Sequence, residues 1–149
     1  MMKVYLASPF FNEKEIKIYE EVIDILRNKN SLDVFVPREH SIPNGWGISN
    51  QLWGEAVFAT DLVALDRCDV VVVLNWGMYS DSGTAWECGY AYAKGKTVIN
   101  VLCGDEKDFS LMMLNGTSKF LTLEQLKRYW FKGLLKGQVE IDYPQINQK

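Results

Sequence analysis

The chain has 149 residues, of which 48% are hydrophobic, and a formal net charge of −3. This length suits one domain with an apolar core, and the lack of a basic run argues against a nucleic-acid partner. No apolar stretch reaches the roughly 20 residues of a membrane span. Three scattered cysteines fit reduced thiols in the cytoplasm, and a single histidine argues against a His-based triad or metal site.

In the N-terminal half, strand-like and helix-like segments alternate. A strand is predicted over residues 4–7, and Asn12, with Glu15 three positions later, is a candidate N-cap for a helix to about residue 29. The other segments of this half are a short strand at 34–36, a loop of functional type at 38–49 and a helix over about 50–67.

The C-terminal half continues the alternation. Residues 70–74 form an unbroken apolar run, VVVVL, which is typical of a strand buried on both faces of a parallel sheet. The segments after it are a helix over about 84–94 capped by Gly95, strands at 97–102 and 120–121, and a helix from a capping box at Thr122 to about residue 131. This order predicts a flavodoxin-like α/β fold, a doubly wound parallel sheet of about five strands with helices on both faces.

The strongest functional signal follows the buried strand, where two acids, Asp81 and Glu87, stand six residues apart. In open α/β sheets the ligand site lies at the carboxyl ends of the strands. Glu87 near a helix N-terminus fits a nucleophile kept ionised by the helix dipole, but it also fits a capping box in which it bonds back to Thr84. Attack at a sugar C1 needs a second acid for the leaving group. Asp61 and Asp81 are candidates, although each also fits a purely structural role.

Aromatic residues crowd the loops at the same edge of the predicted sheet. Phe10, after the first predicted strand, and Trp46, after the second, are candidates for stacking a planar base, and Trp53 also follows the second strand. Gly83 fits a tight turn and Gly89 a close approach of helix and sheet, but neither belongs to a G-x-G-x-x-G pattern. Since G-x-x-x-x-G-K-[ST] is also missing, the sequence predicts neither a dinucleotide nor an ATP site.

The chain resembles the nucleoside 2-deoxyribosyltransferases, which exchange bases on 2′-deoxynucleosides without phosphate. The resemblance rests on the strand VYLASPFF at 4–11, on Asp61, on Asp69 and above all on DSGTAWECG at 81–89. It implies that Glu87 forms a covalent 2-deoxyribosyl–enzyme. It further implies that Tyr5 orients Glu87 and that Asp61 protonates or holds the leaving base, with no metal or organic cofactor.

The same resemblance implies a set of substrate-binding residues. Asp81 would bind deoxyribose hydroxyls, while Phe10 would lie on the base side. Ser110 stands before the Leu–Met pair. At this position many relatives have an Asn, which a neighbouring subunit contributes to bind the sugar 5′-hydroxyl. A homo-oligomer with shared active sites is therefore expected. In similar enzymes, dimers assemble into a hexamer. The predicted substrate-binding set is Asp81, Phe10, Gly83, Trp46, Trp53, Ser110 and Met112.

Two other functions stay open. Related hydrolases cleave 2′-deoxynucleoside 5′-monophosphates; they have a serine at the position of Asp81 and an arginine in the turn after the first strand, where residues 8–11 hold no cation. Ser110 favours the hydrolases, but an aspartate about 4 Å from a phosphate costs on the order of 4 kcal/mol at an effective dielectric of about 20. A non-catalytic nucleoside sensor is the other alternative. It is disfavoured because several carboxylates gathered in one pocket need a chemical reason.

Overall fold

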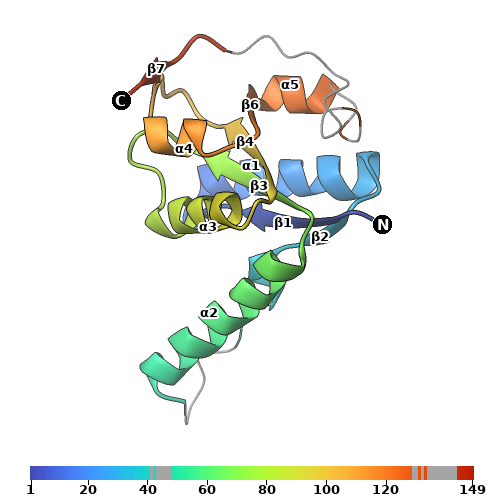
Figure 1. Ribbon diagram of the computed structural model, residues 1–149, viewed down its shortest axis with the longest axis vertical. Helices are drawn as coiled ribbons and strands as arrows, with labels where there is room; N and C mark the ends of the chain where they lie inside the picture. The colour runs from blue at the N-terminus through green and yellow to red at the C-terminus, as the bar shows by residue number, and fades with distance from the viewer. Residues whose placement is uncertain (41, 43–47, 129–130, 132, 134–143) are drawn as a thin grey trace.

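The computed structural model describes residues 1–40, 42, 48–128, 131, 133 and 144–149. A sheet of five parallel strands forms its centre (Figure 1), with the spatial order β2-β1-β3-β4-β6. This is the flavodoxin-like order, which reverses between β1 and β3. The predicted fold class is therefore confirmed. The strands are β1 (Lys3–Ala7), β2 (Asp33–Phe35), β3 (Val70–Asn75), β4 (Thr97–Leu102) and β6 (Lys119–Thr122).

Helices cover both faces of the sheet because alternate strand residues point to opposite sides. On one face, Val4 and Leu6 of β1 pack with residues of α1 (Glu13–Asp24) and α5 (Leu123–Arg128). On the other face, Tyr5 and its neighbours pack against α2 (Asn50–Arg67) and α3 (Ser82–Ala93). All six residues of β3 are buried, as its apolar run predicts.

Side-chain caps fix several helix ends at the predicted residues. The Asn12 side chain accepts a hydrogen bond of 3.0 Å from the backbone N–H of Glu15 and so begins α1. At the end of α3, Gly95 has φ +70°, the left-handed conformation that glycine adopts without steric cost. The Gly95 N–H donates to the Tyr92 carbonyl and the Lys96 N–H to the Ala91 carbonyl, both at 3.0 Å. This pair of bonds is a Schellman motif.

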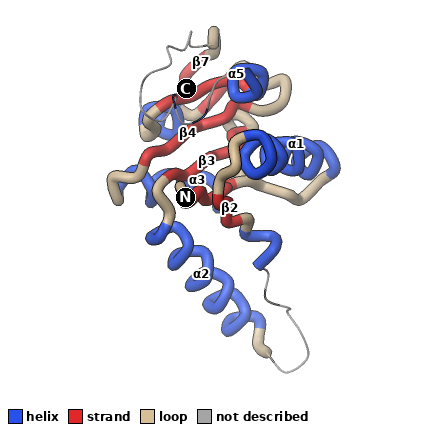
Figure 2. Tube along the Cα trace, turned by 90° about the vertical axis from the view of Figure 1, so that its right-hand side faces the viewer, coloured by secondary structure: helices blue, strands red, loops and turns tan. Residues whose placement is uncertain are grey.

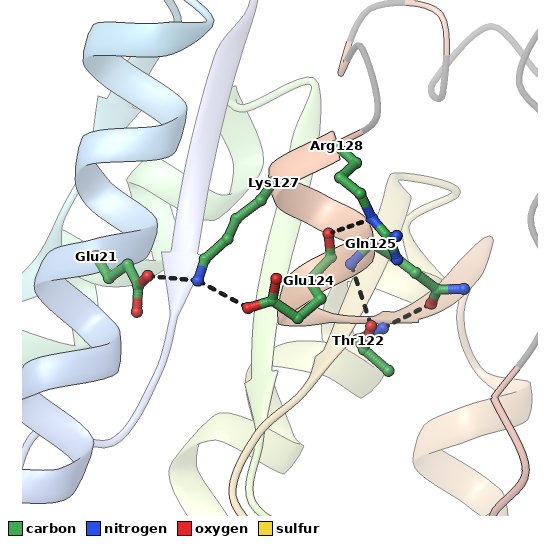
Figure 3. Close-up of polar contacts among 6 residues, drawn as sticks. All are labelled: Glu21, Thr122, Glu124, Gln125, Lys127 and Arg128. Carbon is green, nitrogen blue, oxygen red and sulfur yellow. Dashed lines mark hydrogen bonds and ion pairs between the residues drawn. The ribbon is translucent and has the colours of Figure 1, made fainter.

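The capping box before α5 is also formed, as Figure 3 shows. The Gln125 N–H donates to Thr122 Oγ1 at 3.1 Å, and the Thr122 N–H donates to Gln125 Oε1 at 2.8 Å. From the same helix, Lys127 Nζ lies 2.7 Å from Glu21 of α1 and 2.9 Å from Glu124. These contacts tie α5 to α1 over one face of the sheet.

Some short elements differ from the prediction. The helix after Asn12 changes to a π-helical turn over Ile25–Lys29, and a 3-10 turn, Pro37–His40, begins the segment predicted as a loop. The remaining elements that the sequence did not predict are β5 (Asp108–Phe109), α4 (Leu111–Asn115) and β7 (Asn147–Gln148). Each is too short to show a hydrophobic period. The predicted end of the last helix, near residue 131, lies beyond the continuously described part of α5.

Helix α2 projects away from the sheet, as both ribbon and tube show (Figures 1 and 2). Of its 18 residues, only Leu65, near its C-terminal end, is buried. Leu52, Phe58 and Val63 are apolar and about half exposed. In the described part of the chain, no helix is long and apolar enough to cross a membrane.

Candidate active site

The centre of the candidate site is a contact between β1 and α3. The Tyr5 hydroxyl donates a hydrogen bond to Glu87 Oε2, although the two residues are 82 positions apart in the sequence. Tyr5 is completely buried, and its ring stacks on Phe35 of β2 with centroids 5.5 Å apart. The buried ring fixes the position of the hydroxyl, so Tyr5 can orient the Glu87 carboxylate. The contact lies beside the β1–β3 switch point, where ligands bind in this type of sheet.

The environment of Glu87 disfavours its charge. Burial raises the pKa of Glu87 to about 7, with the nearby charges of Asp61 and Asp81 adding to the rise and the Tyr5 hydrogen bond opposing it. The sequence placed Glu87 in the first helical turn, where the dipole favours a carboxylate. That prediction is wrong, because α3 begins at Ser82 and Glu87 falls in its second turn, beyond the reach of the dipole.

Asp81, and not Thr84, begins α3. Asp81 Oδ2 accepts hydrogen bonds from the Thr84 N–H at 2.8 Å and from the Thr84 hydroxyl at 2.9 Å. The alternative in which Glu87 serves as the partner of a Thr84 cap is therefore wrong. Gly83 leaves room for this carboxylate, since a Cβ there would lie 3.2 Å from Asp81 Oδ2. The cap leaves the Glu87 carboxylate available for other chemistry.

A cavity of about 630 Å³ lies between α2 and α3, with Glu87 and Asp61 in its wall. This volume falls in the range of small-molecule sites. Burial raises the pKa of Asp61, which favours its protonated form. Aromatic rings make up much of the remaining wall, and Phe58 meets Trp86 edge to face with centroids 5.4 Å apart. The lining residues are Trp53, Gly54, Val57, Phe58, Asp61, Leu62, Leu65, Ser82, Gly83, Trp86 and Glu87.

A second cavity of about 630 Å³ lies on the other side of α2, against β2. Its wall includes Phe35 and His40, whose rings stack with centroids 4.2 Å apart, but none of the predicted site residues. Among the described residues, no group of three His, Cys, Asp or Glu side chains could hold a metal ion. The chemistry that the sequence predicts therefore gathers at the cavity between α2 and α3.

The structure does not bring every predicted residue to this cavity. Asp81 borders a smaller cavity of about 250 Å³, together with Asn12, Lys14 and Glu15 of the β1–α1 region. The Phe10 ring packs on Phe11 and Tyr19, with centroids 5.5 and 5.6 Å away. Trp46 lies outside the described residues.

The remaining two predicted residues, Ser110 and Met112, border a third cavity with Cys88 and Tyr92 of α3. Cys88 and Tyr92 lie on a different face of α3 from Trp86 and Glu87, given the helical period. Within one chain, therefore, Ser110 and Met112 stand apart from the Glu87 cavity.

Comparison with known proteins identifies the family. The family model described as nucleoside 2-deoxyribosyltransferase matches residues 4–129. The chain belongs to this family. It is thus an enzyme of a pentosyltransferase family, and the match spans the Tyr5, Asp61 and Glu87 positions described above.

Individual relatives agree with this assignment. The 2-deoxyribosyltransferase of Bacillus psychrosaccharolyticus is 34% identical, with a TM-score of 0.74 over 89% of this chain and 95% of its own. The nucleoside deoxyribosyltransferase of Lactobacillus leichmannii is 22% identical over 86% of this chain and 88% of its own. A CMP N-glycosidase of Clostridium botulinum shares the fold, with a TM-score of 0.55 and 22% identity over 87% of this chain and 96% of its own.

In this deoxyribosyltransferase-family chain, sequence reasoning missed two aromatic residues of the cavity wall, Phe58 and Trp86. Trp86 stands directly before Glu87 and is 48% exposed, and Phe58 of α2 is 51% exposed beside it. The signal for Trp86 was its place inside the DSGTAWECG motif. For Phe58 it was the spacing to Asp61, which puts both on one side of a helix.

Proposed function

We propose that this protein exchanges bases on 2′-deoxynucleosides by double displacement, through a covalent 2-deoxyribosyl ester of Glu87. The observation that carries the proposal is the Tyr5–Glu87 hydrogen bond at the wall of an aromatic cavity that also holds Asp61. An oriented carboxylate, a second acid of raised pKa and a surface for a planar base are the three parts that such a reaction needs.

In the first step, a Glu87 oxygen attacks C1′ and the C1′–N bond breaks, with its electron pair going to the base. The base leaves with a proton delivered through Asp61, which lies in the wall of the same cavity and whose pKa is raised by burial. In the second step, a nitrogen of the incoming base attacks C1′ and returns its proton to Asp61. The ester bond breaks and the Glu87 carboxylate is restored.

Tyr5 has two roles in this mechanism. Its hydroxyl holds Glu87 in one orientation, so the attacking oxygen need not be ordered during the reaction. We also place the sugar C2′ close to Tyr5, where a ribose hydroxyl would compete for the hydrogen bond to Glu87. The protein should therefore prefer 2′-deoxynucleosides to ribonucleosides.

The proposed ligands are small molecules, 2′-deoxynucleosides and free nucleobases, and no cofactor is needed. The base would stack among Trp53, Phe58 and Trp86, which line the cavity. Asp81 would receive sugar hydroxyls, and a base-side role for Phe10 stays a prediction. The three cysteines are free thiols, which supports a reducing compartment such as the cytoplasm.

We further propose that the active site is shared between subunits of a homo-oligomer that is built from dimers, such as a hexamer. Ser110 and Met112 border a different face of α3 from Glu87, so they can reach a Glu87 cavity only in a second copy. Met112 is 76% exposed, and Phe58 of α2 is also exposed beside its cavity. Such apolar groups on the surface of one chain are typical of an interface.

Hydrolysis of deoxynucleoside 5′-monophosphates is the less supported alternative. A phosphate at the small cavity near α1 would meet two carboxylates, Asp81 and Glu15, against one lysine, Lys14. The charge of Asp81 already adds to a raised pKa of Glu15, mainly caused by burial, which indicates that negative charge is unwelcome there. A neutral sugar hydroxyl suits this surface better than a phosphate.

One experiment separates these functions. Thymidine incubated with free adenine, without phosphate, should give deoxyadenosine and thymine. The hydrolase alternative predicts free base without transfer, and faster turnover of deoxyadenosine monophosphate than of deoxyadenosine. A sensor would bind the nucleoside and leave it unchanged. Comparable turnover of adenosine and deoxyadenosine would contradict the role given to Tyr5.

A further inference from the structure

The last residues of the chain return to the α4 segment and bond to its backbone. The Asn147 N–H donates to the Lys107 carbonyl at 2.8 Å, and the Lys149 N–H donates to the Phe109 carbonyl at 3.0 Å. The Leu111 N–H, at the start of α4, donates to the Lys149 carbonyl at 2.9 Å. Through these bonds β5 and β7 pair as two short parallel strands, and in Figure 1 the C-terminus lies beside α4.

Side chains reinforce this pairing at both ends of the segment. Asp108 receives two contacts of 2.9 Å from the tail, one from Asn147 Nδ2 and one from Lys149 Nζ. At the end of α4, Asn115 Nδ2 donates to Gln148 Oε1 at 2.8 Å. Ile146 also packs against a small cluster that contains the buried Phe109 and Leu114. The tail thus contacts the segment before α4, at the first residue of α4 and at its last residue.

The inner side of the same segment is held by the sheet. Asn100 of β4 is completely buried, and its Nδ2 donates to the Met113 carbonyl at 3.3 Å. The outer side is left open, since Leu111 is 45% and Met112 76% exposed. Ser110, at the N-cap position, makes no side-chain cap hydrogen bond. The segment is therefore fixed on two sides, while Met112 is exposed and the half-buried Ser110 borders the same cavity as Met112.

A helix as short as α4 cannot order itself, because nucleation costs more than its few hydrogen bonds return. Its order must come from its neighbours, and the tail supplies the Leu111 partner and both Asp108 contacts. We propose that residues 147–149 are positioning residues that hold α4, and through it Ser110 and Met112, in the geometry that completes the catalytic cavity of a neighbouring subunit. This inference rests on the proposed function.

The first test removes the tail with a stop after Ile146 and uses Gln145→Ala as a matched control at an exposed neighbouring position. Losing several hydrogen bonds should speed hydrogen exchange of the peptide containing residues 109–115 by about tenfold or more. The KM for deoxynucleoside should rise by about tenfold, with kcat changed by less than about threefold. The control should match the parent protein in both measurements.

Two outcomes would overturn the inference: unchanged exchange of that peptide, or a loss confined to kcat. If the truncated chain does not fold, the double variant Gln148→Ala with Lys149→Ala removes two side-chain contacts of the tail, to Asn115 and to Asp108, and keeps the backbone pairing. It should shift exchange and KM in the same direction by a smaller factor. The exchange measurement needs no substrate, so a failure of the proposed base exchange is distinguished from a failure of the tail's role.

A mixing experiment tests whether the tail serves a neighbour. Subunits lacking residues 147–149 keep Glu87, and full-length Glu87→Ala subunits keep the tail. In mixed oligomers, the second kind of subunit should complete the cavity of the first, so KM should return towards the parent value. An unchanged KM after mixing would overturn the proposed action across subunits.

Discussion

In the cavity between α2 and α3, the reactive groups are fixed by the protein's own core. Tyr5 is completely buried, and its hydroxyl holds Glu87 where burial raises the pKa of the acid. In the α4 segment, by contrast, Met112 is exposed and Ser110 is half-buried, and the segment is held by contacts from the tail and from Asn100. On the proposed function, the first region supplies preorganised chemistry within one chain, while the second acts by completing the site of a second chain.

The largest expected effect lies in the first region. Glu87→Ala should lower base exchange by about four orders of magnitude or more, as for the loss of a covalent nucleophile. The fold should persist, because Glu87 makes no cap bond to Thr84 and its burial disfavours its charge. Steady-state assays and thermal unfolding of the purified variant check both parts. Base exchange retained by a folded Glu87→Ala protein would remove the nucleophile from the mechanism.

A smaller effect is expected for Tyr5→Phe, which removes the hydroxyl that orients Glu87. We expect kcat to fall by about 10–100-fold, the scale of one lost charge-assisted hydrogen bond. In the parent enzyme, kcat/KM should rise with pH through about 7, because only the ionised Glu87 attacks. The Tyr5 hydrogen bond lowers the pKa of Glu87, so this rise should move to higher pH in Tyr5→Phe. An unmoved pH profile would contradict the coupling.

Glu87→Gln should change stability in a pH-dependent way. The pKa of Glu87 is raised in the folded state from an ordinary 4.5 to about 7, so the acid contributes stability below its unfolded pKa and this contribution is lost as pH rises through 7. At pH 8 the neutral glutamine should therefore raise the free energy of unfolding by about 1–3 kcal/mol, and the difference should vanish near pH 4–5. Urea titrations at the two pH values measure it. A variant that is equally destabilised at both would contradict the burial argument.

The smallest effect belongs to the second region. Ser110→Ala should raise KM by about 3–10-fold, the value of one hydrogen bond to a sugar hydroxyl, with little change in stability. The hydroxyl makes no cap hydrogen bond whose loss would weaken the fold. The matched control is Ser118→Ala, whose hydroxyl accepts from the Val98 N–H at 3.0 Å and should affect stability more than KM. The reverse pattern would move Ser110 from substrate binding to structure.

The sequence predicted the long elements well because their signals are local. The apolar run of β3, the Asn12 cap and the Thr122 capping box each lie within a few residues. The start of α3 was harder, since Asp81 and Thr84 are both good caps and only the contacts of the Asp81 carboxylate decide between them. Because α3 begins at Ser82, Glu87 lies in the second turn and not next to the helix N-terminus, as the sequence had predicted.

The candidate site was predicted only in part. Glu87 and Asp61 were found from their motif and from the family resemblance, but the raised pKa of Glu87 depends on burial that no local pattern states. The aromatic wall formed by Phe58 and Trp86 depends on how α2 packs on α3, and only Leu65 of α2 is buried. The tail contacts join residues about 40 positions apart through two-residue strands, which leave no period to detect.

The most direct test of the account is to capture the covalent intermediate. A 2-fluoro-2-deoxyribosyl nucleoside should slow release of the sugar from the enzyme, so intact-mass measurement should show one 2-fluoro-2-deoxyribosyl adduct per chain. Peptide mapping should place it on Glu87, and an incoming base should remove it. Turnover without any adduct, or an adduct on another residue, would contradict the double displacement through Glu87.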